Sequence, residues 1–190
     1  MNKTAIVLAL KPRFAQAILD GRKTIEVRRR LPRIETPART FLYQTADSTG
    51  SGRIMGECIL RAVHSTDHFD MIDLLNLSNR SCASINELAA YWRGVKSAVM
   101  LGLERPLRYY TPILLPNLQR ECPNHKITHP QSWLYWPPEV VAAVDRILKQ
   151  QRPIHEIVED IVADIPESEM EKLPTDLATN LDDYLYGGKE

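Results

Sequence analysis

The sequence lacks three features that would assign it to a class at once: paired cysteines, a long apolar run and a net charge. Its three cysteines, Cys58, Cys82 and Cys122, lie far apart in the chain. An odd number without paired spacing argues against a secreted disulfide framework and against a zinc knuckle. We therefore expect a protein of the reducing cytoplasm, with no metal site and no cofactor.

The sequence also has no apolar run of the roughly 18 residues that a membrane-spanning helix requires. Its N-terminus carries a short apolar stretch, but Lys11, Pro12 and Arg13 follow before any cleavage site of a signal peptide. We interpret residues 5–10 as a first strand and expect no membrane as a partner.

The formal net charge is zero, yet the two signs are separated along the chain. Residues 1–40 hold ten Lys or Arg against three Asp or Glu, a net of +7, and residues 155–190 hold eleven acids against two lysines, a net of −9. Such asymmetry indicates an anionic partner for the first segment, and a cationic partner or self-contact for the second. Two solvated faces explain the charges about equally well.

The periodicity of apolar residues predicts a β-rich α+β domain. We expect a short helix over 12–20, a capped helix beginning at Ser84, where Glu87 completes a capping box, and six strands: 5–10, 23–29, 40–45, 54–64, 97–104 and 108–115. Gly56 predicts a bulge or bend in the fourth strand. The stretches over 65–83 and 124–138 are less regular, and we interpret the second as a loop.

The C-terminal part follows a helical pattern. We expect one amphipathic helix over 139–151 and a second, acidic on one side, over 154–165. The predicted domains are therefore 1–137, the core, and 138–190, a helical acidic extension with a partly mobile tail. The extension is expected to bind a protein partner or to fold back on the basic part of the chain, and dimerisation through its apolar stripe is an equal alternative.

The segment from Gly21 to Arg30 carries five cations and one carboxylate. Within it, Ile25 and Val27 alternate with charged residues, which predicts a strand with an apolar face and a charged face. The charged residues follow the spacing Gly21-x-Lys23-x-x-Glu26-x-Arg28.

This spacing resembles the GxKxxExR motif of ASCH domains, a family of the PUA-like superfamily. The resemblance covers about residues 5–136 and includes Leu8 to Pro12, Phe41 to Tyr43 and Pro130 to Trp133. It implies a small PUA-like β-barrel with flanking helices and a cleft lined by the motif. It also implies RNA binding, or in some members enzymatic action on RNA or on acetylated cytidine.

We therefore expect a regulatory or binding module whose partner is RNA or single-stranded nucleic acid. The candidate contacts are cations and hydrogen-bonding groups for phosphates and base edges, and aromatic rings for stacking: Lys23, Glu26, Arg28, Arg30, Tyr43, Gln131, Ser132 and Trp133. Each also has a structural interpretation, as a surface cation, an ion pair, a core aromatic or a loop cap.

The alternative function is hydrolysis of RNA or of a modified nucleoside such as N4-acetylcytidine. Lys23 and Glu26 would then be the catalytic acid/base pair. In the amidohydrolase branch of the family, a threonine that resembles the nucleophile stands three residues after the motif lysine, and this sequence departs from that branch by having Glu26 there. That difference favours binding over deacetylation, and whether the protein is an enzyme stays open.

Overall fold

The computed structural model describes residues 5–30, 32–46, 52–68 and 70–151. They belong to one compact unit, Met1–Gln151. The helix predicted over 154–165 and the acidic tail lie outside the described residues.

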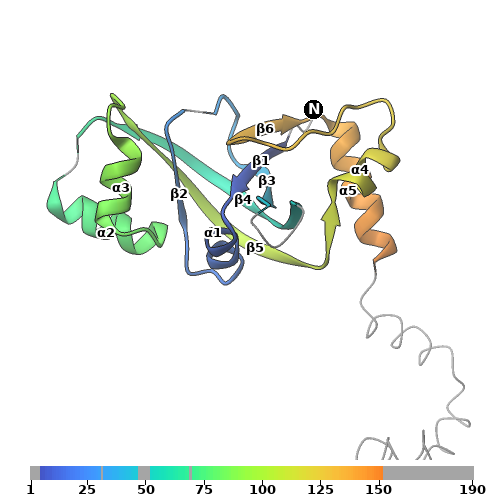
Figure 1. Ribbon diagram of the computed structural model, residues 1–190, viewed down its shortest axis with the longest axis horizontal. Coiled ribbons are helices and arrows are strands. Elements are labelled where there is room, and N and C mark those ends of the chain that lie inside the picture. Colours follow the sequence, from blue (N-terminus) through green and yellow to red (C-terminus); the bar gives the residue numbers. More distant parts are fainter. Residues whose placement is uncertain (1–4, 31, 47–51, 69, 152–190) are drawn as a thin grey trace, which may run out of the picture. The chain divides into compact units, whose positions relative to one another are not determined.

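The described residues form a mixed six-stranded sheet with five helices (Figure 1). The strands are β1 (Ala5–Leu10), β2 (Ile25–Arg28), β3 (Ala38–Gln44), β4 (Arg53–Thr66), β5 (Ala98–Leu114) and β6 (Trp133–Trp136). They pair in the order β2-β5-β4-β3-β1-β6, with β1 and β3 parallel and the other pairs antiparallel. The predicted α+β class with a PUA-like barrel is confirmed, and the barrel is an open half-barrel whose terminal strands are β2 and β6.

Strand β1 is buried along its whole length, which explains its uninterrupted apolar sequence. Its side chains alternate between two cores. Ile6, Leu8 and Leu10 join the core covered by α1 (Pro12–Leu19), and Ala5, Val7 and Ala9 join the core covered by α4 (Leu115–Glu121) and α5 (Pro138–Gln150). The sheet therefore has a packed layer on each face.

The long β4–β5 pair is continuous where the sequence predicted a break between 104 and 108. Arg105 has a φ of 51°, and the register skips from Glu57 opposite Leu107 to Ile59 opposite Glu104. A bulge thus absorbs Arg105 and Pro106, since proline cannot donate to a ladder and is tolerated at bulges. The bend predicted at Gly56 is also present, as a register shift between Ile54 and Gly56.

Two helices that lie apart from α4 and α5 in Figure 1 cover β2. They are α2 (Met71–Ser81) and α3 (Ile85–Trp92), and each begins with a capping box. The box at Ser84 was predicted, whereas α2 occupies a stretch that was expected to be irregular, although Asp70 and Asp73 mark its start. A small apolar cluster of α2 and α3 packs on the outer side chains of β2, Ile25 and Val27.

The helix predicted over 139–151 is confirmed as α5. Val140, Val144 and Ile147 are buried in the same core as Phe41 and Tyr43 of β3. The compact unit accordingly reaches Gln151, and a separate role for 138–190 stays a prediction. No helix in the described part of the chain is long and apolar enough to cross a membrane.

Candidate functional site

A cavity of about 690 Å³ lies where α1, α3, β2 and the loop before β6 meet. Its lining combines charged groups with aromatic and aliphatic walls, and includes Lys11, Arg13, Phe14, Lys23, Glu26, Val27, Arg28, Thr45, Glu87, Leu88, Tyr91, Gln131 and Ser132. Pockets that hold small ligands have this mixture of apolar walls and a few polar groups.

The turn after α1 brings the motif into this cavity. Gly21 adopts a φ of 73°, a left-handed conformation that favours glycine and ends the helix. The backbone N–H groups of Arg22 and Lys23 then donate to the Ala17 carbonyl at 3.0 and 2.9 Å. This turn explains the motif glycine, and it leaves Lys23 only 2% exposed.

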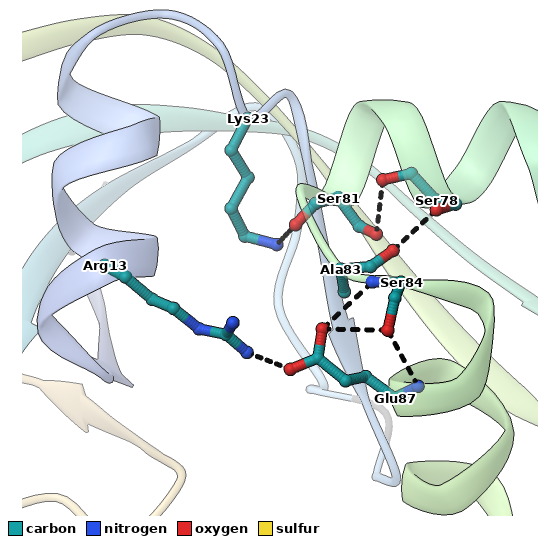
Figure 2. A network of polar contacts seen from close by, with 7 residues as sticks. All are labelled: Arg13, Lys23, Ser78, Ser81, Ala83, Ser84 and Glu87. Carbon is teal, nitrogen blue, oxygen red and sulfur yellow. Dashed lines mark hydrogen bonds and ion pairs between the residues drawn. The ribbon is translucent and has the colours of Figure 1, made fainter.

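Lys23 uses two of its three N–H donors on backbone carbonyls. Its Nζ donates to the carbonyl oxygens of Ile25 at 2.8 Å and Ser81 at 2.5 Å, and it lies 3.0 Å from Glu26 Oε2. Figure 2 shows the contact with Ser81, which joins the motif to the end of α2. An ammonium carries three donors, so Lys23 holds β2 against α2 and orients Glu26.

Arg28 joins two strands that are not neighbours in the sheet. Its Nη1 forms an ion pair with Glu26 Oε1, and its Nη2 donates to the carbonyl of Ala9 in β1 at 2.7 Å. Because β2 ends the strand order and β1 is next to the other end, this side chain bridges the open seam of the half-barrel. Lys23, Glu26 and Arg28, hereafter the motif cluster, are all more than nine-tenths buried.

Two buried atoms of the motif cluster have no hydrogen-bond partner: Glu26 Oε2 and Arg28 Nε. The 3.0 Å contact of Glu26 Oε2 with Lys23 is an ion pair whose angles are not those of a hydrogen bond. Buried polar groups are nearly always hydrogen-bonded in native proteins, so each exception needs an explanation. Both residues line the cavity, where a ligand could supply the missing partners.

An ion pair between α1 and α3 stands on the rim of the cavity. Arg13 contacts Glu87, as Figure 2 shows, and its guanidinium lies 4.3 Å from the centre of the Phe14 ring. Glu87 also accepts from the backbone N–H of Ser84 at the start of α3. The hydrogen bond from Arg13 and the one from Ser84 lower the pKa of Glu87 to about 2.

The charged lining is positive overall. Lys11, Arg13, Lys23 and Arg28 stand against Glu26 and Glu87, a net of +2. Lys11 and Arg13 are exposed, whereas Lys23 and Arg28 are buried. The cavity therefore attracts anions at its mouth and offers directional hydrogen bonds inside.

Five of the candidate residues line the cavity together: Lys23, Glu26, Arg28, Gln131 and Ser132. The Ser132 carbonyl accepts from Ala9 N–H at 2.9 Å, which fixes the loop before β6 beside the motif cluster. The other three lie elsewhere. Arg30 is exposed, Tyr43 is buried in the core under α5 with its hydroxyl against His129 Nδ1, and Trp133 packs edge-to-face on Tyr135.

The ion pair between Arg13 and Glu87 on the rim was not predicted from the sequence. Arg13 was counted as a basic residue and Glu87 was recognised as a capping residue, but nothing in their spacing indicated that α1 and α3 meet. Phe14 and Tyr91 also line the cavity. That α1 and α3 bring these two rings to one cavity could be recognised only from the packing.

Comparison with known proteins gives consistent results. The ASCH domain family model matches residues 8–97. The chain is 28% identical over 135 residues to a Zymomonas mobilis protein named ASCH domain-containing ribonuclease, covering 70% of this chain and 86% of that protein. It also resembles the crystal structure of ASCH from Zymomonas mobilis, with a TM-score of 0.60 and 27% identity over 75% of this chain and 94% of that one.

A more distant likeness concerns the fold alone. The N-terminal domain of Staphylothermus marinus McrB gives a TM-score of 0.51 with 10% identity, covering 75% of this chain and 93% of that one. The motif with its glycine turn, the half-barrel and the match to the family model agree with one another. Residues 8–97 therefore match the ASCH domain family, which belongs to the PUA-like superfamily.

Proposed function

We propose that this protein binds single-stranded RNA through the cavity at the seam of the half-barrel. The observation that carries the proposal is a positively charged cavity whose lining includes Glu26 and Arg28, each with one buried polar atom that has no hydrogen-bond partner. The name of the Zymomonas relative, a ribonuclease, supports RNA as the class of ligand.

In this proposal the exposed cations at the mouth contact phosphates and the floor contacts a less charged part of the RNA. Lys11 and Arg13 attract the backbone, so binding weakens as salt rises. Tyr91 offers a ring for stacking, and Arg29 supports it by donating to the Tyr91 carbonyl at 2.6 Å and lying 4.9 Å from the ring centre. Lys23 positions Glu26 and makes no ligand contact of its own.

Gln131 and Ser132 remain proposed contacts at the cavity, whereas Arg30, Tyr43 and Trp133 are proposed only as parts of a wider surface, since they lie outside its lining. Arg30 is exposed and follows the motif directly, so it suits a phosphate of a longer RNA.

The test changes residues at the mouth of the cavity, because they are exposed and can be replaced without disturbing the core. The double variant Lys11→Ala and Arg13→Ala is compared with wild type in binding a short single-stranded RNA at several salt concentrations. We expect weaker binding and a salt slope that falls by roughly 0.7 for each phosphate that the variant no longer neutralises. The matched control is Lys126→Ala with Lys149→Ala, which removes two exposed lysines outside the cavity. Equal affinity of the two double variants at low salt would refute the proposal.

Hydrolysis of RNA is a second candidate, favoured by the name of the relative. If the chain is an enzyme, Lys23 and Glu26 are the proposed catalytic pair, with Glu26 Oε2 as the proton acceptor because it accepts no hydrogen bond within the fold. Wild type and Glu26→Gln are incubated with unstructured RNA and with acetylated cytidine, and the products are identified by mass. Absence of product with wild type rejects hydrolysis for those substrates.

The acidic extension is proposed to bind a protein partner or to compete with RNA for the basic cavity. Truncation after Gln151 tests competition, which requires the shortened chain to bind RNA more tightly than the full chain.

The cytoplasm remains the proposed location, because Cys58, Cys82 and Cys122 are all free thiols.

A further inference from the structure

We infer that the part of the RNA that enters the cavity is one unpaired nucleobase, read along its hydrogen-bonding edge by Glu26 and Arg28. This inference rests on the proposed RNA binding and specifies which chemical group the floor recognises. It begins with two buried atoms that have no hydrogen-bond partner: Glu26 Oε2, which is ion-paired with Lys23, and Arg28 Nε.

The two atoms require hydrogen-bonding partners of opposite kinds, one donor and one acceptor. A carboxylate oxygen accepts a hydrogen bond, and the guanidinium Nε–H donates one. The ligand must therefore present a donor and an acceptor side by side. The Watson–Crick edge of every nucleobase does so, whereas a phosphate diester offers only acceptors and a negative charge that Glu26 repels.

The charge distribution of the cavity indicates where the base and where the phosphates of an RNA nucleotide would bind. Inside, the motif cluster makes most of its hydrogen bonds internally, so few of its N–H donors are left to bind a phosphate. At the mouth, Lys11 and Arg13 are exposed. A nucleotide would thus place its base on the floor and its phosphates at the mouth.

The walls suit a flat, apolar face. Phe14 comes from α1, and Leu88 and Tyr91 from α3, so two separate elements flank the floor with aromatic or aliphatic side chains. Every base has a π-face, and stacking on aromatic side chains is tolerant of sequence. The cavity of about 690 Å³ lies within the range of pockets that enclose small ligands.

Recognition of this edge has a consequence for specificity. The edge of a paired base is occupied by its partner, and a base within a duplex is stacked on its neighbours. The protein should therefore bind single strands, loops or flipped-out bases, and should bind paired RNA weakly.

The experiment changes the ligand first, so that folding of a variant is not at issue. Wild-type full-length protein is titrated with a short mixed-sequence RNA, with the same RNA annealed to its complement, and with a strand of equal length in which abasic residues replace all nucleotides. We expect the abasic and the annealed strands to bind about tenfold or more weakly than the single strand. Equal binding of the abasic strand would overturn the base inference and leave RNA binding intact. No binding of any strand at low salt would instead reject the proposed function.

A variant then assigns the contact. Arg28→Lys keeps the positive charge but removes Nε–H, and Lys126→Arg is the matched exchange outside the cavity. For a variant that retains the wild-type unfolding midpoint, we expect weaker binding of the intact strand and no change for the abasic strand. Equal weakening for both strands would show that Arg28 acts on the backbone and would overturn the assignment.

Discussion

Two clusters of charged residues, one buried and one partly buried, each combine arginine with glutamate but differ in what they do. The motif cluster of Lys23, Glu26 and Arg28 lies at the cavity. The second, hereafter the strand–helix cluster, consists of Arg39, Glu57, Tyr109 and Asp145 and joins β3, β4 and β5 to α5.

The strand–helix cluster is satisfied internally. Arg39 donates to Glu57 Oε2 from Nε at 3.0 Å and from Nη2 at 2.6 Å, and its Nη1 lies 2.7 Å from Asp145. The Tyr109 hydroxyl donates to the same Glu57 oxygen at 2.5 Å. Burial, reinforced by the neighbouring Glu57 charge, raises the pKa of Tyr109, so this hydroxyl stays protonated.

The two clusters differ in whether all of their buried polar atoms have hydrogen-bond partners. Among the described residues, the strand–helix cluster contributes no buried atom without a partner, whereas the motif cluster contributes two. A complete network stabilises a fold, and an incomplete network that faces a cavity is prepared for a ligand. The comparison therefore predicts that changes in one cluster alter stability alone and changes in the other alter stability and binding.

The largest expected effect comes from removing the central carboxylate of the motif cluster. Glu26→Ala leaves Lys23 and Arg28 buried without their counter-charge, and breaking a buried pair in this way costs about 3–5 kcal/mol of unfolding free energy. Urea titration followed by circular dichroism measures the loss. A loss below about 1 kcal/mol, the size for an exposed pair, would mean that the cluster is not buried in solution.

A smaller loss is expected from the strand–helix cluster. Arg39→Met removes hydrogen bonds to Glu57 and Asp145 but leaves those two carboxylates partly accessible, so we expect about 1–3 kcal/mol. RNA affinity of the folded variant should equal that of wild type, because Arg39 does not line the cavity. A drop in affinity at unchanged fold would erase the distinction between the clusters.

A modest gain in affinity is expected at the rim. Glu87→Gln retains a side chain that can cap α3 but releases Arg13 for phosphate, so RNA should bind about threefold more tightly at low salt. Glu35→Gln, at an exposed acid outside the cavity, is the control for general charge. If both variants gain equally, the effect is long-range charge and not the release of Arg13.

The same variant has a defined pH dependence. The pKa of Glu87 is depressed from 4.5 to about 2 in the folded state, so its ion pair contributes stability above pH 4.5 and loses it as the pH falls through about 2. The affinity difference between wild type and Glu87→Gln should hence stay constant between about pH 5 and pH 8. Titration of binding across this range would contradict the assignment if the difference vanished at pH 5.

The smallest effect is a difference in cysteine reactivity. Burial raises the pKa of Cys58 to about 12, and its side chain is 1% exposed beneath the half-barrel, whereas Cys82 is partly exposed at the end of α2. Alkylation of the native protein near neutral pH should modify Cys82 well before Cys58, with mass spectrometry as the readout. Rapid labelling of Cys58 would show that the core around the sheet opens readily.

The chain carried much of this architecture in local patterns. Short apolar segments located β1, β3 and β4, the period-two pattern located β2, the capping box located α3, and the apolar stripe located α5. Patterns of this kind are legible because each residue's face follows from its position in its own element. The prediction failed where the structure of a segment depends on its pairing with a distant strand. At Arg105, pairing with β4 continues the strand, and the predicted break is a bulge.

The candidate site divides in the same way. The motif spacing was enough to select Lys23, Glu26 and Arg28, but it did not show that two of the Lys23 donors are used by backbone carbonyls at 25 and 81. The aromatic residues were harder, since Tyr43 and Trp133 look like Phe14 and Tyr91 in a sequence. Which aromatic ring packs in a core and which lines a cavity depends on neighbours from other elements.

The sequence by itself indicated the likeness to ASCH domains, the positions of most strands along the chain and the charged face of β2, because these follow from residue spacing within short segments. Only the tertiary structure decided that this charged face is buried, that Arg28 spans the seam to Ala9, and that Arg13 meets Glu87. The physical reason is that these contacts join residues far apart in the chain, which come within hydrogen-bonding distance only in the folded sheet. The same fold leaves Glu26 Oε2 and Arg28 Nε without hydrogen-bond partners.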